Sequence, residues 1–131
     1  MKLLLRPPLF GKMWLVDWHG LLPYWQRSWQ YDSVKDETLL AAFSTHWFSS
    51  KGGPRRFVIG HIDYFPHEPC VMFSNGTHRT RVLAKQLRYL PLSAHSATYR
   101  NKHLAPFFLR RIEKTEEFEV PDFPVHPIPK T

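Results

Sequence analysis

The residues with the clearest chemical potential lie at positions 75–79, where the sequence reads Asn-Gly-Thr-His-Arg. An apolar run from Cys70 to Phe73 precedes them and helical spacing follows, so the pattern predicts a strand, a tight turn and a helix. Gly76 can adopt the positive φ that such a turn needs, and the turn would leave the N–H groups of residues 77–79 at a helix start. Such a helix start binds anions, phosphate above all.

The side chains of this stretch extend the predicted chemistry. Arg79 could make a bidentate phosphate contact, and His78 could donate a hydrogen bond or carry a proton near neutral pH. We therefore expect His78 and Arg79 to be candidate catalytic residues, within a phosphate- or nucleotide-binding set of Asn75, Gly76, Thr77, His78 and Arg79. The alternative is a β-hairpin, because Asn-Gly between apolar runs also predicts one, with residues 77–83 as the returning strand.

The helix predicted after Gly76 has an apolar side and a cationic side. Leucines repeat at helical spacing on one side and basic residues on the other, namely Leu83, Leu87 and Leu90 against Arg81, Lys85 and Arg88. We call the basic row the cationic ridge; it could bind nucleic acid or be an ordinary solvated face. A predicted basic loop over residues 49–56 offers Lys51, Arg55 and Arg56 as further phosphate contacts, or as charges that keep an exposed loop solvated.

Acidic residues shortly before the motif raise the question of a metal ion. If the connection between the strands folds back, Asp63 or Glu68 could hold a divalent cation such as Mg²⁺ beside a phosphate at Gly76, and Glu68 would then join the catalytic set. The alternative is a polar turn, since no spacing of carboxylates and histidines here matches a recognised metal signature.

Residues 75–79 followed by a helix resemble the [Asp/Asn]-Gly-x-His-Arg signature of the ParB/sulfiredoxin superfamily, whose phosphate-binding box lies at a strand-to-helix turn. Thr77 stands where sulfiredoxins carry cysteine, so sulfinic acid repair is not expected. The small size and tryptophan-rich start are similar to those of plasmid fertility inhibition factors, which block transfer of another plasmid or of T-DNA. This resemblance implies ATPase and DNase activity, with ATP or another nucleotide, DNA and a transfer-machinery protein as partners. A non-catalytic basic module that binds DNA or protein is the alternative.

Composition limits the class of protein. The chain has 131 residues, 43% of them hydrophobic, and a formal charge of +7, which suits one domain with a polyanionic partner, nucleic acid before an acidic protein or membrane surface. Its one cysteine, Cys70, excludes an internal disulfide and is expected to be a buried strand thiol. The initial apolar run ends at Arg6 and no later run could span a bilayer, so we expect a cytoplasmic protein without membrane insertion.

The remaining pattern predicts a compact single-domain α+β or α/β fold, a small mixed sheet with flanking helices, and the resemblance implies that this fold is ParB/sulfiredoxin-like. Strands are expected at 13–18, 57–63 and 70–73, with a short edge strand at 89–92. Further helices are expected at 33–48 and from residue 104 or 106 to 118. The aromatic residues of 24–31 could form core or stack on bases. The domain would cover residues 1–119, followed by a proline-rich tail at 120–131.

Overall fold

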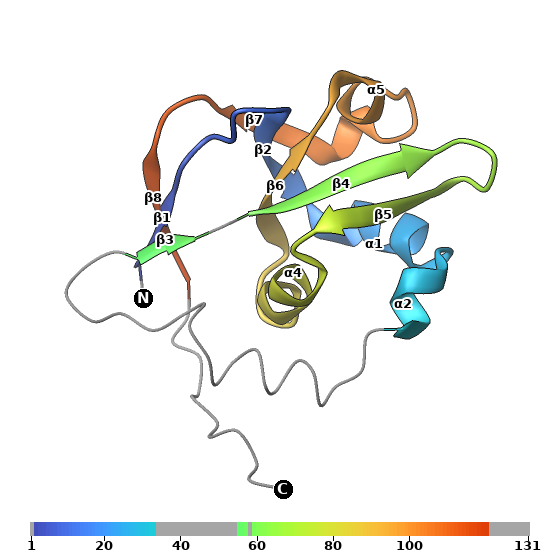
Figure 1. Ribbon diagram of the computed structural model, residues 1–131, viewed down its shortest axis with the longest axis horizontal. Coiled ribbons are helices and arrows are strands. Elements are labelled where there is room, and N and C mark those ends of the chain that lie inside the picture. Colours follow the sequence, from blue (N-terminus) through green and yellow to red (C-terminus); the bar gives the residue numbers. More distant parts are fainter. Residues whose placement is uncertain (1, 34–54, 58, 121–131) are drawn as a thin grey trace, which may run out of the picture.

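A mixed five-stranded sheet with strand order β5-β4-β6-β2-β7 lies at the centre of the computed structural model, which describes residues 2–33, 55–57 and 59–120 (Figure 1). Its strands are β2 (Lys12–Asp17), β4 (Gly60–Phe65), β5 (Cys70–Asn75), β6 (Tyr89–Ala94) and β7 (Phe108–Ile112). The β4–β6 pair is parallel and the other neighbours are antiparallel. A second, three-stranded sheet has the order β3-β1-β8, formed by β1 (Lys2–Leu5), β3 (Arg55–Phe57) and β8 (Glu116–Glu119).

Short helices accompany the large sheet, which confirms the α+β class (Figure 1). They are α1 (Trp18–Gln26), α2 (Trp29–Ser33), α4 (Thr77–Ala84) and α5 (Ser96–Tyr99), with a 3₁₀ turn η1 (Ala105–Phe107). Helix α1 follows β2 without a loop, because the Asp17 side chain caps it by accepting a hydrogen bond from the His19 N–H at 3.1 Å. None of the helices in the described residues is long and apolar enough to cross a membrane.

The hydrophobic core joins the large sheet with helices α1 and α4 and with β1 of the small sheet. Trp18 and Trp25 of α1 are almost fully buried, with their ring centroids 5.6 Å apart, and Phe73 of β5 packs 5.5 Å from Trp25. Leu83 of α4 is buried in the same cluster. For these buried aromatic residues, core packing is therefore the observed role, whereas Trp29 remains 70% exposed.

Strand β5 is an edge strand of the large sheet, and a side chain of α2 hydrogen-bonds to the backbone on its unpaired side. The amide of Gln30 donates to the Phe73 carbonyl at 2.7 Å and accepts from the Phe73 N–H at 2.8 Å. The same amide oxygen accepts from the Trp25 indole N–H at 3.3 Å. Gln30 thus makes both hydrogen bonds that a paired strand would offer Phe73, which covers part of an otherwise exposed edge.

Several sequence predictions are confirmed and others are wrong. The strands expected at 13–18 and 70–73 and the buried thiol of Cys70 are present, and burial raises the pKa of that thiol, with the Glu68 charge adding to the rise. The strand expected at 57–63 is instead divided between β3 and β4, which belong to different sheets. The prediction of a basic loop at 49–56 is wrong for residues 55 and 56, which belong to β3 and pair with β1. The helix expected at 33–48 lies outside the described residues beyond Ser33, as does the tail beyond Val120, which is itself buried.

The strand expected at the sheet edge after α4 is central in the structure. Strand β6 pairs with β2 along its whole length and with β4 only through residues 92–94. Pro91 lies just before the β4 pairing begins, so its missing N–H removes no bond of that ladder. On the β4 side, proline therefore costs the sheet no hydrogen bond.

The helix expected from residue 104 or 106 to 118 is also wrong. After η1 the chain forms β7, which pairs with β2, and β8, which pairs with β1. Phe108 and Ile112 are buried in β7, and a spacing of four places residues on one side of a helix or of a strand alike. Pairing with β2 therefore decides the outcome here.

Candidate functional site

The turn at Gly76 joins β5 to α4 as the sequence predicts. Gly76 has φ of 79°, and the helix begins at Thr77. The first helical bond runs from the Thr80 N–H to the Gly76 carbonyl at 3.0 Å, and the Thr80 hydroxyl donates to the same carbonyl at 2.8 Å. The N–H groups of residues 77–79 therefore precede the first intrahelical bond. The alternative hairpin, with residues 77–83 as a strand, is wrong.

Close contact with β4 fixes the position of this first helical turn. A Cβ added at Gly60 would lie 2.5 Å from the Thr80 hydroxyl oxygen, so only glycine at this position lets α4 approach so closely. Asn75, at the end of β5, pairs in register with His61 of β4. The helix start is thus held between the beginning of β4 and the end of β5 (Figure 1).

The motif residues differ in exposure. Asn75 is exposed, whereas Gly76, Thr77 and His78 are half-buried. Arg79 lies in the first turn of α4. This arrangement leaves the helix start within reach of a ligand while its scaffold is buried.

The cationic ridge expected on this helix is not a continuous row along one helix, although the Lys85 N–H still bonds to the Arg81 carbonyl at 3.3 Å. Helix α4 ends at Ala84, so Lys85 and Arg88 lie beyond it. The Arg81 guanidinium packs over the Tyr31 ring, 5.2 Å from its centroid, and donates to the Tyr31 carbonyl at 3.3 Å. Arg81 therefore ties α4 to α2, and of the ridge only Lys85 and Arg88 are exposed.

Arg88 makes a bidentate ion pair with Asp17, which pairs in register with the next residue, Tyr89. Its Nε and Nη2 atoms donate to the two carboxylate oxygens of Asp17 at 3.1 and 3.0 Å. The hydrogen bonds from Arg88 are the main cause that lowers the pKa of Asp17, and the Asp17 carboxylate in turn raises the pKa of Arg88. A phosphate would have to compete with this carboxylate for Arg88.

The other predicted contacts are separated from the turn. Arg55 and Arg56 belong to β3, and Lys51 lies outside the described residues. Glu68 is exposed in the β4–β5 turn, at the opposite end of β5 from Gly76, so the fold-back that would bring it to a phosphate there is not observed (Figure 1). In the described part of the chain, no cluster of three or more His, Cys, Asp or Glu side chains could hold a metal ion.

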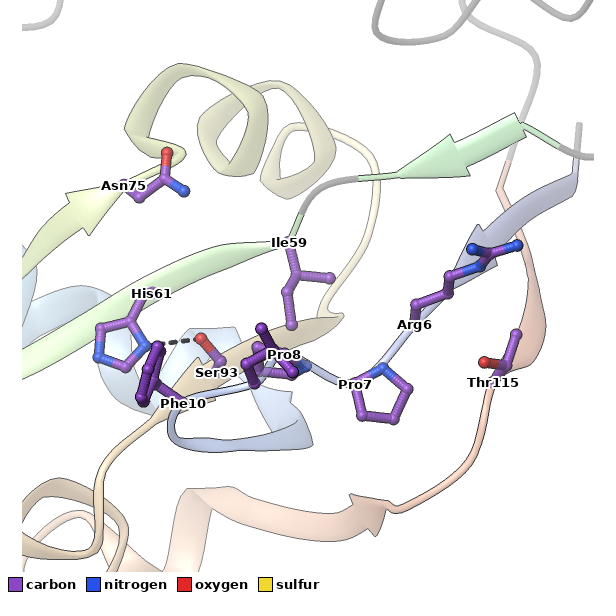
Figure 2. Close-up of a pocket in the computed structure, with 10 residues that line it drawn as sticks. Arg6, Pro7, Pro8, Phe10, Ile59, His61, Asn75, Ser93 and Thr115 are labelled. Carbon is purple, nitrogen blue, oxygen red and sulfur yellow. Dashed lines mark hydrogen bonds between the residues drawn. The ribbon is translucent and has the colours of Figure 1, made fainter.

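A cleft of about 610 Å³ adjoins the turn on the side of Asn75 (Figure 2). The lining comes from the connection between β1 and β2 (Arg6, Pro7, Pro8 and Phe10), from Ile59 just before β4, and from His61 and Ser93 in the sheet. Leu9 and Phe10 are largely exposed at its border. The lining is mainly apolar, with a few polar groups, which is the usual character of a small-molecule site.

Four polar side chains lie together where β4 and β6 run parallel. Ser93 Oγ is 2.6 Å from His61 Nδ1 (Figure 2), and His61 Nε2 is 3.4 Å from Asp63 Oδ1. The ring of His95 packs edge-on against the His61 ring, with centroids 4.8 Å apart. The register pairs His61 with Ser93, and Asp63 and His95 follow two residues later on the same side of their chains.

Sequence patterns do not predict this cluster as a unit. His61 and Asp63 stand two apart in an apolar strand, which is a visible signal for a polar face, but Ser93 begins a segment without clear periodicity. Only the parallel pairing of β4 with β6 brings the two parts together.

Comparison with known proteins adds no relatives: no protein-family model, no curated protein and no solved structure matches this chain.

Proposed function

We propose that this protein binds phosphate groups of DNA or of a nucleotide at the turn formed by residues 75–79. The observation that carries the proposal is the start of α4, where Gly76 has positive φ and the N–H groups of residues 77–79 precede the first helical bond. Amides in this position, with the positive end of the helix dipole, favour a bound anion. The formal charge of +7 further favours a polyanion.

The proposed roles follow the residue types. The amides of Thr77 and His78 would bind phosphate oxygens, Arg79 would neutralise charge, and His78 would move a proton in any hydrolysis. Asn75 lies between this turn and the cleft, so the rest of a nucleotide could extend along the cleft lining. Because Glu68 is at the far end of β5, we do not assign it a role in this chemistry.

The particular activity we propose is that of a cytoplasmic plasmid fertility inhibition factor that hydrolyses ATP or DNA and thereby blocks conjugative transfer. Its support is the resemblance of residues 75–79 to the ParB/sulfiredoxin signature, together with the strand-turn-helix at that signature. A divalent cation such as Mg²⁺ would enter with the nucleotide phosphates.

The second candidate is a non-catalytic module that binds DNA or a transfer-machinery protein. The observation that favours it is the absence, among the described residues, of an acidic cluster able to hold a metal ion. The two candidates share the phosphate-binding turn and differ only in turnover.

Binding of ATP and of DNA by Arg79→Ala tests the proposal. A lost charge-assisted hydrogen bond is worth about 1.5–3 kcal/mol, so affinity should fall about tenfold to a hundredfold. For DNA, the slope of log affinity against log salt should fall by about one, as expected for one lost phosphate contact. Lys102→Ala, which removes an exposed charge elsewhere, is the matched control and should change affinity less.

His78→Ala separates the two candidates. If the protein is a hydrolase, this variant should slow hydrolysis while binding persists, because general acid–base catalysis contributes about 10²–10⁴-fold. Wild-type protein that binds but never hydrolyses would favour the non-catalytic module. Arg79→Ala with unchanged affinity for both ligands, in a folded variant, would contradict phosphate binding at this turn.

A further inference from the structure

We propose that Ser93 is the nucleophile of an acyl-transfer site in the cleft, with His61 as its general base and Asp63 as the residue that positions His61. The inference does not depend on phosphate binding at the turn. It rests on two contacts: Ser93 Oγ lies 2.6 Å from His61 Nδ1 (Figure 2), and His61 Nε2 lies 3.4 Å from Asp63 Oδ1. A nucleophile, a base within hydrogen-bond reach and a third group beyond the base form the arrangement that activates a serine.

The proposal requires the His61 tautomer with its hydrogen on Nε2. Asp63 Oδ1, 3.4 Å from Nε2, can only accept and is therefore compatible with that tautomer. Nδ1 then has a lone pair directed at the Ser93 hydroxyl and can accept its proton. The His95 ring against His61 limits rotation of the imidazole, which keeps both contacts in place.

Ser93 differs from a serine that merely satisfies buried backbone. Ser28, the matched example, donates at 2.7 Å to the Trp25 carbonyl of the preceding turn, a common local bond. Ser93 has its nearest partner in an imidazole from another strand, at 2.6 Å, and its hydroxyl makes a longer hydrogen bond of 3.5 Å to the Gly60 carbonyl. Ser93 is only 3% exposed, yet it lines the cleft, so the surface that remains faces the space where a ligand would lie.

The reaction is an ordinary acyl transfer from an ester. A bond forms between Ser93 Oγ and the acyl carbon as the hydroxyl proton moves to His61 Nδ1, and the bond to the leaving alcohol breaks as that alcohol takes the proton. Water then attacks the acyl-serine, gives a proton to His61, and Ser93 Oγ recovers it on departure. The net change is ester plus water to acid plus alcohol, without any oxidant or reductant.

The cleft lining indicates the class of ester. Pro7, Pro8 and Ile59 supply apolar surface for a short acyl chain, and Phe10 borders the opening. Arg6 adds one guanidinium to the lining, which would favour an anionic group on the alcohol side. We therefore infer a small ester with an apolar acyl group as substrate.

The test is covalent labelling by a small alkyl fluorophosphonate, in which Ser93 Oγ bonds to phosphorus as fluoride leaves and His61 takes the proton. The protein is labelled and digested, and the adduct is then located by mass spectrometry. We expect one adduct on Ser93, lost in Ser93→Ala and retained in the control Ser28→Ala. Hydrolysis of p-nitrophenyl butyrate should likewise be lost in Ser93→Ala and retained in Ser28→Ala.

Two further variants address activation without removing the nucleophile. His61→Gln keeps a hydrogen-bonding side chain but no base, and should slow labelling about a hundredfold or more. Asp63→Asn should slow it less, with partial recovery in Asp63→Glu, while thermal unfolding stays unchanged. Absence of labelling at Ser93, or labelling there at a rate that His61→Gln does not alter, would overturn the proposal.

Discussion

Replacing Gln30 by alanine should destabilise the fold by removing the hydrogen bonds between its side chain and the edge strand β5. The side chain makes a donated bond of 2.7 Å and an accepted bond of 2.8 Å with the backbone of Phe73, at a partly buried position. Each neutral hydrogen bond contributes about 0.5–1.5 kcal/mol net, so the two together predict a loss of about 1–3 kcal/mol in the free energy of unfolding. The variant also loses the 3.3 Å hydrogen bond from the Trp25 indole N–H, which raises the lower end of the predicted loss of stability.

Urea denaturation followed by tryptophan fluorescence measures this loss directly. Gln26→Ala, at an exposed position at the end of α1, is the matched control and should stay within about 0.5 kcal/mol of the parent. Gln30→Glu should fall between them, because it keeps an acceptor for the Phe73 N–H but places a carboxylate against the Phe73 carbonyl. A loss below about 0.5 kcal/mol for Gln30→Ala would refute the view that this side chain completes the sheet edge.

Gly60→Ala should destabilise the protein by about 1–3 kcal/mol and weaken phosphate binding, because its Cβ would meet the Thr80 hydroxyl at 2.5 Å and displace the first turn of α4. Calorimetry measures the stability and an ATP titration measures the affinity. An unchanged affinity for ATP would contradict the link between Gly60 and phosphate binding at α4. Asp17→Asn should lower stability at neutral pH, since Arg88 depresses the pKa of Asp17 and the charged form is then the stabilising one. This contribution is lost as pH falls below the ordinary range of an aspartate, so the gap between parent and variant should close in acid; a gap independent of pH would exclude the ion pair as its cause.

Local signals predicted the turn at Gly76 because they lie within a few residues of it. The apolar run of β5 ends at Asn-Gly, glycine allows positive φ, and the spacing after it favours a helix over a returning strand. The length of α4 was overestimated, because Leu90 repeats at helical spacing but is buried as part of β6. Spacing alone does not distinguish a continued helix from a helix followed by a strand.

Long-range pairing determines what the sequence did not predict. Phe108 and Ile112 fit either element, and their place beside β2 makes them strand residues. The contact between His61 and Ser93 joins positions 32 residues apart, through a parallel pairing that leaves no local trace. Arg88 illustrates the same limit, because its partner Asp17 lies 71 residues away.

The most direct test of the proposed function is an amide NMR titration of the ¹⁵N-labelled protein with ATP and with a short DNA duplex. If the start of α4 holds phosphate, the largest shifts should fall on the N–H signals of Gly76, Thr77, His78 and Arg79, and inorganic phosphate should shift the same signals at higher concentration. Saturable binding whose shifts fall elsewhere, with these amides unmoved, would contradict it.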